Sequence, residues 1–144
     1  MQRLNATPFL RLALMVDALA SGATGLLLAI LSGPLGALFG LPASLLLGVG
    51  LFFLPYAAAV AFVATRPAPA RFAVRAIIAL NLTWVVDSVL FAAFSGALAG
   101  LAPSALGVAF VLVQAALVLG FAAMQAVALK RAGGGQLMAA PRPA

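Results

Sequence analysis

Four apolar runs, each long enough to cross a bilayer, constrain this chain more than any other feature of its sequence. They cover about residues 9–31, 43–65, 72–95 and 104–129. A helix rises 1.5 Å per residue, so about 20 residues cross a hydrocarbon core of about 30 Å. Inside that core every backbone N–H and C=O must be paired within the protein, and a single run achieves this only as a helix. The sequence therefore predicts an all-α membrane protein with four transmembrane helices.

Composition excludes the main alternatives. Hydrophobic residues make up 66% of the chain and charged residues 7%, whereas a soluble domain carries about a quarter charged residues. The chain has no cysteine and no histidine, which excludes disulfide scaffolds, zinc sites and histidine-ligated haem. No catalytic triad, metal-ligand cluster or phosphate-binding loop is present either. We therefore expect no cofactor and no enzymatic activity.

The distribution of charge predicts how the chain is threaded. The net charge of +6 would suggest nucleic acid in a soluble protein, but here both acids lie inside apolar runs and the basic residues lie at or near the ends of the runs. The eight basic residues are Arg3, Arg11, Arg66, Arg71, Arg75, Lys130, Arg131 and Arg142. By the positive-inside rule both termini and the middle loop are cytoplasmic. Ala is abundant and Arg greatly outnumbers Lys, a bias that suggests a bacterium with a GC-rich genome. We therefore expect the bacterial inner membrane, with the lipid bilayer and not nucleic acid as partner.

The segments between the runs are short. Residues 1–8 form a polar lead, and two uncharged Gly- and Pro-containing segments, 32–42 and 96–103, are predicted to be turns. Asp17 lies where the apolar core of a signal peptide would be, so we expect the first run to be retained. Residues 132–144 contain three consecutive glycines and two prolines and are predicted to be a disordered cytoplasmic tail.

The two halves of the chain share a pattern of polar residues. At one offset Arg11 matches Arg75, Asp17 matches Asn81 and Thr24 matches Ser88. With small gaps, the pair Gly40-Leu41 also matches Gly100-Leu101. The sequence therefore predicts two tandem helical hairpins. Because each hairpin has an even number of crossings, the two would run in the same direction, related by an axis along the membrane normal.

Polar residues near the middle of the runs are the candidate functional site, because intramembrane polar groups are costly. On helical wheels they gather on common faces, and they are predicted to form one buried layer. Its members are Asp17, Thr24, Asn81, Trp84, Asp87, Ser88 and Gln114. Pro55, in the second run, cannot donate to the Leu51 carbonyl and is predicted to break or kink that helix.

Two interpretations of this layer stay open. Polar side chains commonly hold membrane helices together at about 0.6 kcal/mol each, and an Asp17–Asn81 hydrogen bond would serve that purpose. Asp87 is harder to explain in this way, because no basic residue lies at its depth and an unpaired charge there is costly. Desolvation should keep its carboxyl protonated, which suits proton-coupled movement.

The chain resembles a group of small four-helix bacterial membrane proteins. The likeness is carried by Arg11-Leu12-Ala13-Leu14 with Asp17, Phe53-Leu54-Pro55-Tyr56-Ala57, Arg75-Ala76, and Ala79-Leu80-Asn81 with Trp84-Val85-Val86. The resemblance implies the architecture and no activity. In such sequences the position of Asp87 is often apolar, which favours Asp17 and Asn81 as the shared groups.

Function is predicted less specifically than fold. We expect a structural or accessory helical bundle that associates with itself, as a homo-oligomer, or with larger membrane partners. The alternative is a small transporter or channel, with proton coupling through Asp17 and Asp87.

Overall fold

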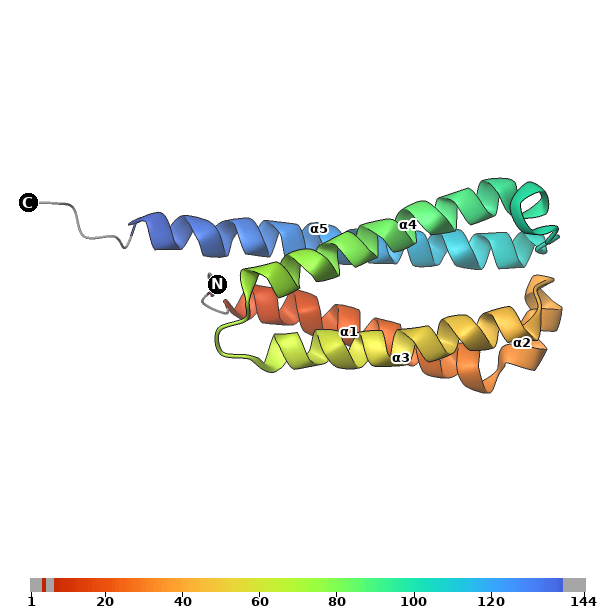
Figure 1. The fold of residues 1–144 in the computed structure, drawn as a ribbon, viewed down its shortest axis with the longest axis horizontal. Coiled ribbons are helices and arrows are strands. Elements are labelled where there is room, and N and C mark those ends of the chain that lie inside the picture. The colour runs from red at the N-terminus through yellow and green to blue at the C-terminus, as the bar shows by residue number, and fades with distance from the viewer. Residues whose placement is uncertain (1–3, 5–6, 139–144) are drawn as a thin grey trace, which may run out of the picture.

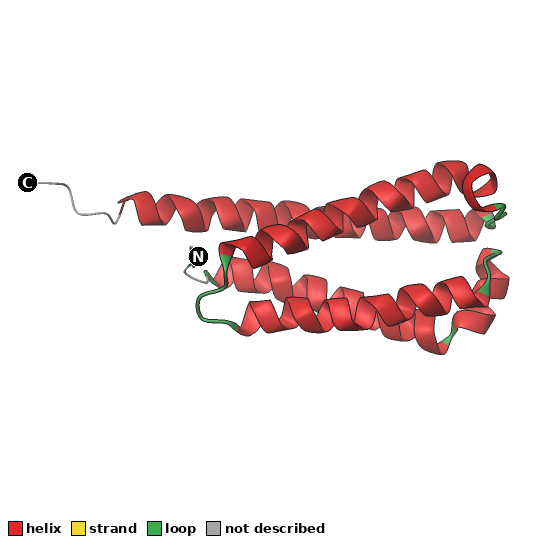
Figure 2. Cartoon of the chain, in the orientation of Figure 1, coloured by secondary structure: helices red, strands yellow, loops and turns green. Residues whose placement is uncertain are grey.

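The computed structural model describes Leu4 and residues 7–138, and its regular structure is entirely helical (Figures 1 and 2). The helices are α1 (Pro8–Ile30), α2 (Ser32–Phe39), α3 (Ala43–Thr65), α4 (Arg71–Ala99) and α5 (Ala105–Met138). Of these, α1, α3, α4 and α5 are long and apolar enough to cross a membrane. The four predicted apolar helices are therefore present, and their ends lie within a few residues of the predicted ones except at the end of α5, which continues past residue 129.

Local sequence explains where the helices begin. Thr7 caps α1 by accepting a hydrogen bond from the Leu10 N–H at 3.2 Å, and Pro8 occupies the first turn, where its missing N–H is harmless. Leu4 is buried, and its N–H donates to the Pro69 carbonyl at 3.0 Å. Leu4 therefore contacts the loop between α3 and α4.

Two predicted irregular segments are helical instead. The first turn, residues 32–42, contains α2, which ends at Gly40 in the left-handed conformation (φ 66°). At the other end of the chain, α5 continues to Met138, so residues 132–138 are helical and not disordered. Extending an existing helix adds one hydrogen bond per residue without a new nucleation cost. The rest of the predicted tail, residues 139–144, lies outside the described residues.

The transmembrane helices form two hairpins that lie side by side. Figure 1 shows α1 packed along α3, and α4 packed along α5. The backbones of the two hairpins approach one another mainly through α1 and α5, whereas the backbones of α3 and α4 come close at few positions. The loop joining α3 to α4, the start of α1 and the end of α5 lie at one end of the bundle, the loop end; α2 lies at the opposite end (Figure 1). Whether the hairpins are an internal repeat in parallel orientation remains a prediction.

Small residues set the spacing within the first hairpin. A Cβ atom on Gly50 would lie 2.6 Å from the Ala29 backbone nitrogen, and one on Gly25 would lie 2.9 Å from the Phe53 Cβ. Real Cβ atoms do not approach this closely, so α1 and α3 touch backbone to backbone. Such contacts between small residues replace the hydrophobic effect as the source of helix association in lipid.

Two apolar cores lie toward the two ends of the bundle. The core at the loop end includes Leu10, Leu14, Val60, Val74 and Leu129. The core near α2 is built from Leu28, Phe39, Leu41 and Leu46, with Phe39 stacked on Phe110 at 4.7 Å between ring centroids. The polar side chains of the candidate site lie between these cores.

Candidate functional site

A hydrogen-bonded network centres on Asp17, which is completely buried. Its Oδ2 atom accepts from Gln125 Nε2 at 2.7 Å, Asn81 Nδ2 at 2.9 Å and the Tyr56 hydroxyl at 3.2 Å. Its Oδ1 atom accepts from the Ser21 hydroxyl at 3.1 Å. The Asp17 carboxyl therefore ties together one residue from each of the three other transmembrane helices.

The partners of Asp17 also bond to one another. The Asn81 amide donates to Gln125 Oε1 at 3.2 Å, and the Tyr56 hydroxyl donates to Asn81 Oδ1 at 2.7 Å. Because a hydroxyl carries a single proton, Tyr56 must share it between Asn81 and Asp17, and the shorter distance favours Asn81. We call Asp17, Ser21, Tyr56, Asn81 and Gln125 the Asp17 network. Its hydrogen bonds make it a closed set of paired groups.

The network confirms the Asp17–Asn81 bond and adds three residues that were not in the predicted site, Ser21, Tyr56 and Gln125. Gln125 is completely buried, yet it lies well past the middle of the predicted fourth run, so a criterion based on helix midpoints passed it over. Tyr56 was not among the polar residues singled out from the sequence. Both could have been identified by the fact that an amide or hydroxyl buried without a hydrogen-bond partner is costly, so a polar side chain within an apolar run is expected to have one.

The other predicted members do not join this network. Gln114 Nε2 donates to Thr24 Oγ1 at 3.1 Å, which forms a separate polar contact between α1 and α5. Ser88 is buried, whereas the side chain of Asp87 is exposed on the surface of the bundle. The prediction of one buried layer is therefore wrong. Side chains on one face of a helix lie at different heights along its axis, so they can meet different neighbouring helices. At the height of Asp87, α3 lies too far from α4 to cover the side chain.

Pro55 does not break its helix. α3 is continuous from Ala43 to Thr65, and the Pro55 side chain lies on its exposed face. The ring removes one backbone donor without ending the helix, because the turns on either side keep their own hydrogen bonds.

A groove runs between α3 and α4, where the hairpins separate. It contains two hollows of about 220 and 310 Å³, both lined by Phe53, Trp84 and Asp87. The Phe53 and Trp84 rings meet at 4.6 Å between centroids and lie between the hollows. Because Phe52, Leu80 and Asp87 on its wall are exposed, the groove opens on the outer face of the bundle. We call it the α3–α4 groove.

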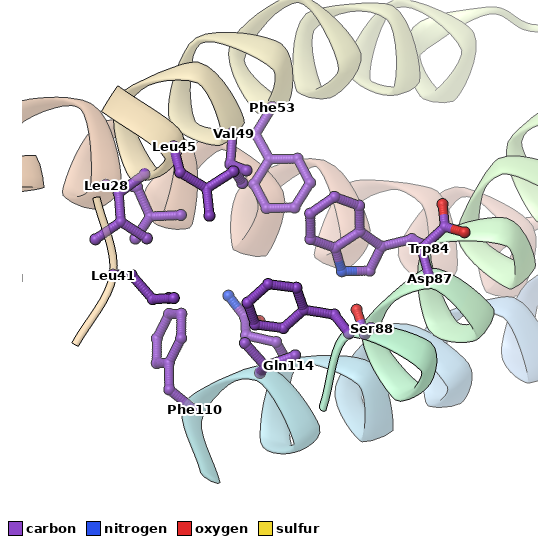
Figure 3. Close-up of a pocket in the computed structure, with 13 residues that line it drawn as sticks. Leu28, Leu41, Leu45, Val49, Phe53, Trp84, Asp87, Ser88, Phe110 and Gln114 are labelled. Carbon is purple, nitrogen blue, oxygen red and sulfur yellow. The ribbon is translucent and has the colours of Figure 1, made fainter. Parts of the chain in front are cut away.

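The smaller hollow is almost entirely apolar, with a few polar groups on its wall (Figure 3). Leu28, Leu45, Val49 and Phe110 supply apolar surface from three helices and Gln114 an amide. Figure 3 shows the Trp84 ring nitrogen on the side that faces the hollow and Gln114, while the Asp87 carboxyl points away.

Trp84 Nε1 is buried and has no hydrogen-bond partner. A buried donor left unpaired costs about 1–3 kcal/mol, and in a bilayer no bulk water replaces the missing acceptor. Among the described residues, Trp84 Nε1 is the one buried polar side-chain atom near the middle of the bundle that lacks a hydrogen-bond partner, and it lies on the groove wall. Within the described residues there is no cluster of Asp, Glu, His or Cys that could hold a metal ion.

A scan of protein families, a search of curated proteins and a search of solved structures gave no match to the chain. The class of the protein therefore rests on its own features. Four long apolar helices, with large apolar side chains such as Leu19, Ile30 and Phe72 exposed on their outer faces, define a multi-pass membrane protein of helical-bundle type.

Proposed function

We propose that this protein is an accessory bundle of the bacterial inner membrane, with both termini in the cytoplasm, that binds a membrane-dissolved molecule in the α3–α4 groove. The molecule is apolar and carries a hydrogen-bond-accepting oxygen, as a ketone, ester or quinone does. Accessory here means that the bundle holds this molecule and moves no solute itself.

The unpaired Trp84 N–H carries this proposal. A carbonyl oxygen entering the smaller hollow would accept from Nε1 and remove the cost of the orphaned donor. Because Nε1 is itself covered, a side chain on the groove wall must rotate to admit the oxygen. A net gain of about 0.5–1.5 kcal/mol for such a bond corresponds to about a 2- to 12-fold gain in affinity.

The walls of the groove suit the rest of such a molecule. Phe53, Phe91 and Phe110 line the smaller hollow, and small-molecule sites are typically apolar and aromatic with a few polar groups that fix orientation. The exposed rim lets a molecule enter from the bilayer without crossing either apolar core.

Trp84 is also the chain's only tryptophan, so its fluorescence reports on the groove directly. We expect a saturable change in emission when the purified protein in detergent is titrated with a long-chain methyl ketone, and none with the alkane of equal length. Val49→Phe fills the smaller hollow and should abolish the response. Val113→Phe makes the same substitution on the exposed face of α5 and should preserve it. Equal responses to ketone and alkane, or in the two variants, would contradict the proposal.

One observation favours the transporter alternative. Asp87 lines both hollows, so a carboxyl lies beside the aromatic contact that separates them. Against it, the Asp17 carboxyl is engaged by four donors and lines neither hollow, although Ser21, Tyr56 and Asn81 line the larger one. Proteoliposomes loaded with a pH-sensitive dye distinguish the two functions. The accessory function predicts no proton flux for the wild type, whereas flux that Asp87→Asn abolishes would establish proton-coupled transport.

A further inference from the structure

A basic hollow lies at the loop end of the bundle, between the start of α4 and the end of α5. Its volume is about 320 Å³, and it is lined by Arg71, Arg75, Ile78, Ala126, Leu129 and Lys130. Three cationic side chains thus surround a floor of aliphatic ones. This site is separate from the α3–α4 groove and does not depend on the function proposed for it.

The chain cannot neutralise these cations with its own acidic side chains. Its only two acidic residues are Asp17 and Asp87. Asp17 is engaged in its network, and Asp87 lies 12 residues beyond Arg75 on the same helix, about 18 Å away at 1.5 Å per residue. Three like charges gathered around one hollow repel each other, so an external anion would stabilise this arrangement.

Arg71 is the residue that points to a ligand. Its Nε atom is buried and makes no hydrogen bond, although a guanidinium donates through Nε together with a terminal nitrogen when it binds a phosphate or carboxylate side-on. Other arginines at this end are engaged elsewhere. The Arg66 guanidinium lies 3.8 Å from the centroid of the Phe62 ring, and that of Arg131 lies 5.5 Å from the Phe9 ring.

We infer that the hollow of Arg71, Arg75 and Lys130 binds a phosphate group. The aliphatic floor of Ile78, Ala126 and Leu129 matches the glycerol and first acyl carbons of a phospholipid, and basic pockets between transmembrane helices are a common form of headgroup site. The phosphate is therefore that of an anionic lipid headgroup or a free phosphate, and the two sources can be separated by experiment.

Native mass spectrometry of the full chain, released from detergent, tests this inference. Phosphatidylglycerol, phosphatidylcholine and inorganic phosphate are titrated separately. A lipid site predicts one tightly retained phosphatidylglycerol and weaker retention of phosphatidylcholine. A free-phosphate site predicts an adduct of inorganic phosphate that phosphatidylglycerol does not displace. If none of the three forms a stoichiometric adduct with the protein, the inference is overturned.

Matched variants separate a built site from general attraction between charges. Arg71→Gln with Arg75→Gln should weaken retention by about tenfold or more, because charge-assisted bonds are lost. Arg66→Gln with Arg131→Gln removes the same charge from the same end of the bundle and should leave retention unchanged. Lys130→Gln, at an exposed side chain, is the second test if the double variant fails to fold. Equal weakening in the two double variants, or full retention in Lys130→Gln, would refute a specific site.

Discussion

Replacing Asp17 with leucine should destabilise the bundle more than any other single change at the predicted polar positions. The substitution removes the acceptor of four hydrogen bonds. At the average of about 0.6 kcal/mol per polar contact between membrane helices, the loss is about 2.4 kcal/mol. Two N–H groups, one on Gln125 and one on Asn81, are also left buried without acceptors, and at up to about 3 kcal/mol each they set an upper limit of about 6 kcal/mol.

Two further variants identify the cause of the lost stability. In Asp17→Asn the amide oxygen can still face Asn81 and Gln125 while its NH₂ group faces the Ser21 hydroxyl, so the loss should be only about 1 kcal/mol. Asp87→Leu removes the chain's other carboxyl from an exposed position between apolar neighbours and should leave stability unchanged or raised.

Equilibrium unfolding in mixed micelles, with increasing denaturing detergent and helical circular dichroism as the readout, measures all three variants. An unfolding free energy for Asp17→Leu within about 0.5 kcal/mol of the wild type would refute the structural role of the network, because even the membrane average predicts several times that loss. An equal loss in Asp87→Leu would show that removing any intramembrane carboxyl has the same effect, and the argument from hydrogen bonds would fail.

Three further predictions follow from other parts of the molecule. Gly50→Ala should destabilise the bundle by about 1–3 kcal/mol in the same unfolding assay, because its Cβ would lie 2.6 Å from the Ala29 nitrogen. The control Gly48→Ala, whose Cβ meets open space, should instead stabilise the bundle by about 0.5–1 kcal/mol through helix propensity. Equal effects of the two substitutions would contradict the close approach of α1 and α3. Tyr56→Phe should cost about 1 kcal/mol by removing the hydroxyl that bonds to Asn81 and Asp17, and no change in unfolding free energy would place Tyr56 outside the network. Because the chain lacks cysteine, a membrane-impermeant maleimide should label Gly33→Cys in intact cells and Pro67→Cys only after the membrane is opened, and the reverse pattern would overturn the predicted threading.

The packing of the helices separates residues that look equivalent in the sequence. Asp17 and Asp87 are both carboxylates near the middle of an apolar run, yet one is enclosed by four donors and the other is exposed beside a groove. The difference arises because α1 is covered by α3 and α5, whereas α4 is covered mainly by α5. Burial of a side chain depends on which neighbour covers its face, and no local pattern of residues specifies that neighbour.

The members of the Asp17 network could likewise be predicted from the sequence only in part. The Asp17–Asn81 bond could be predicted because both residues lie at the middle of their runs and match one another between the two halves. Gln125 could not be placed, because its depth depends on how far α5 is shifted along its axis relative to α1. Tyr56 could not be assigned either, since an aromatic residue with a hydroxyl suits an apolar core and a polar network equally well.

The sequence by itself determined the class of the protein and the number of long apolar helices, because backbone hydrogen bonding in a bilayer leaves a long apolar run no structure other than a helix. It did not determine that α2 forms or where α5 ends. It also predicted the hydrogen bond between Asp17 and Asn81, which the structure contains. Only the tertiary structure decided that Asp17 is saturated, that the Trp84 N–H is unpaired, and that α3 and α4 part to leave a groove. These properties depend on distances between helices far apart in the chain, which are set by close contacts such as that of Gly25 with Gly50.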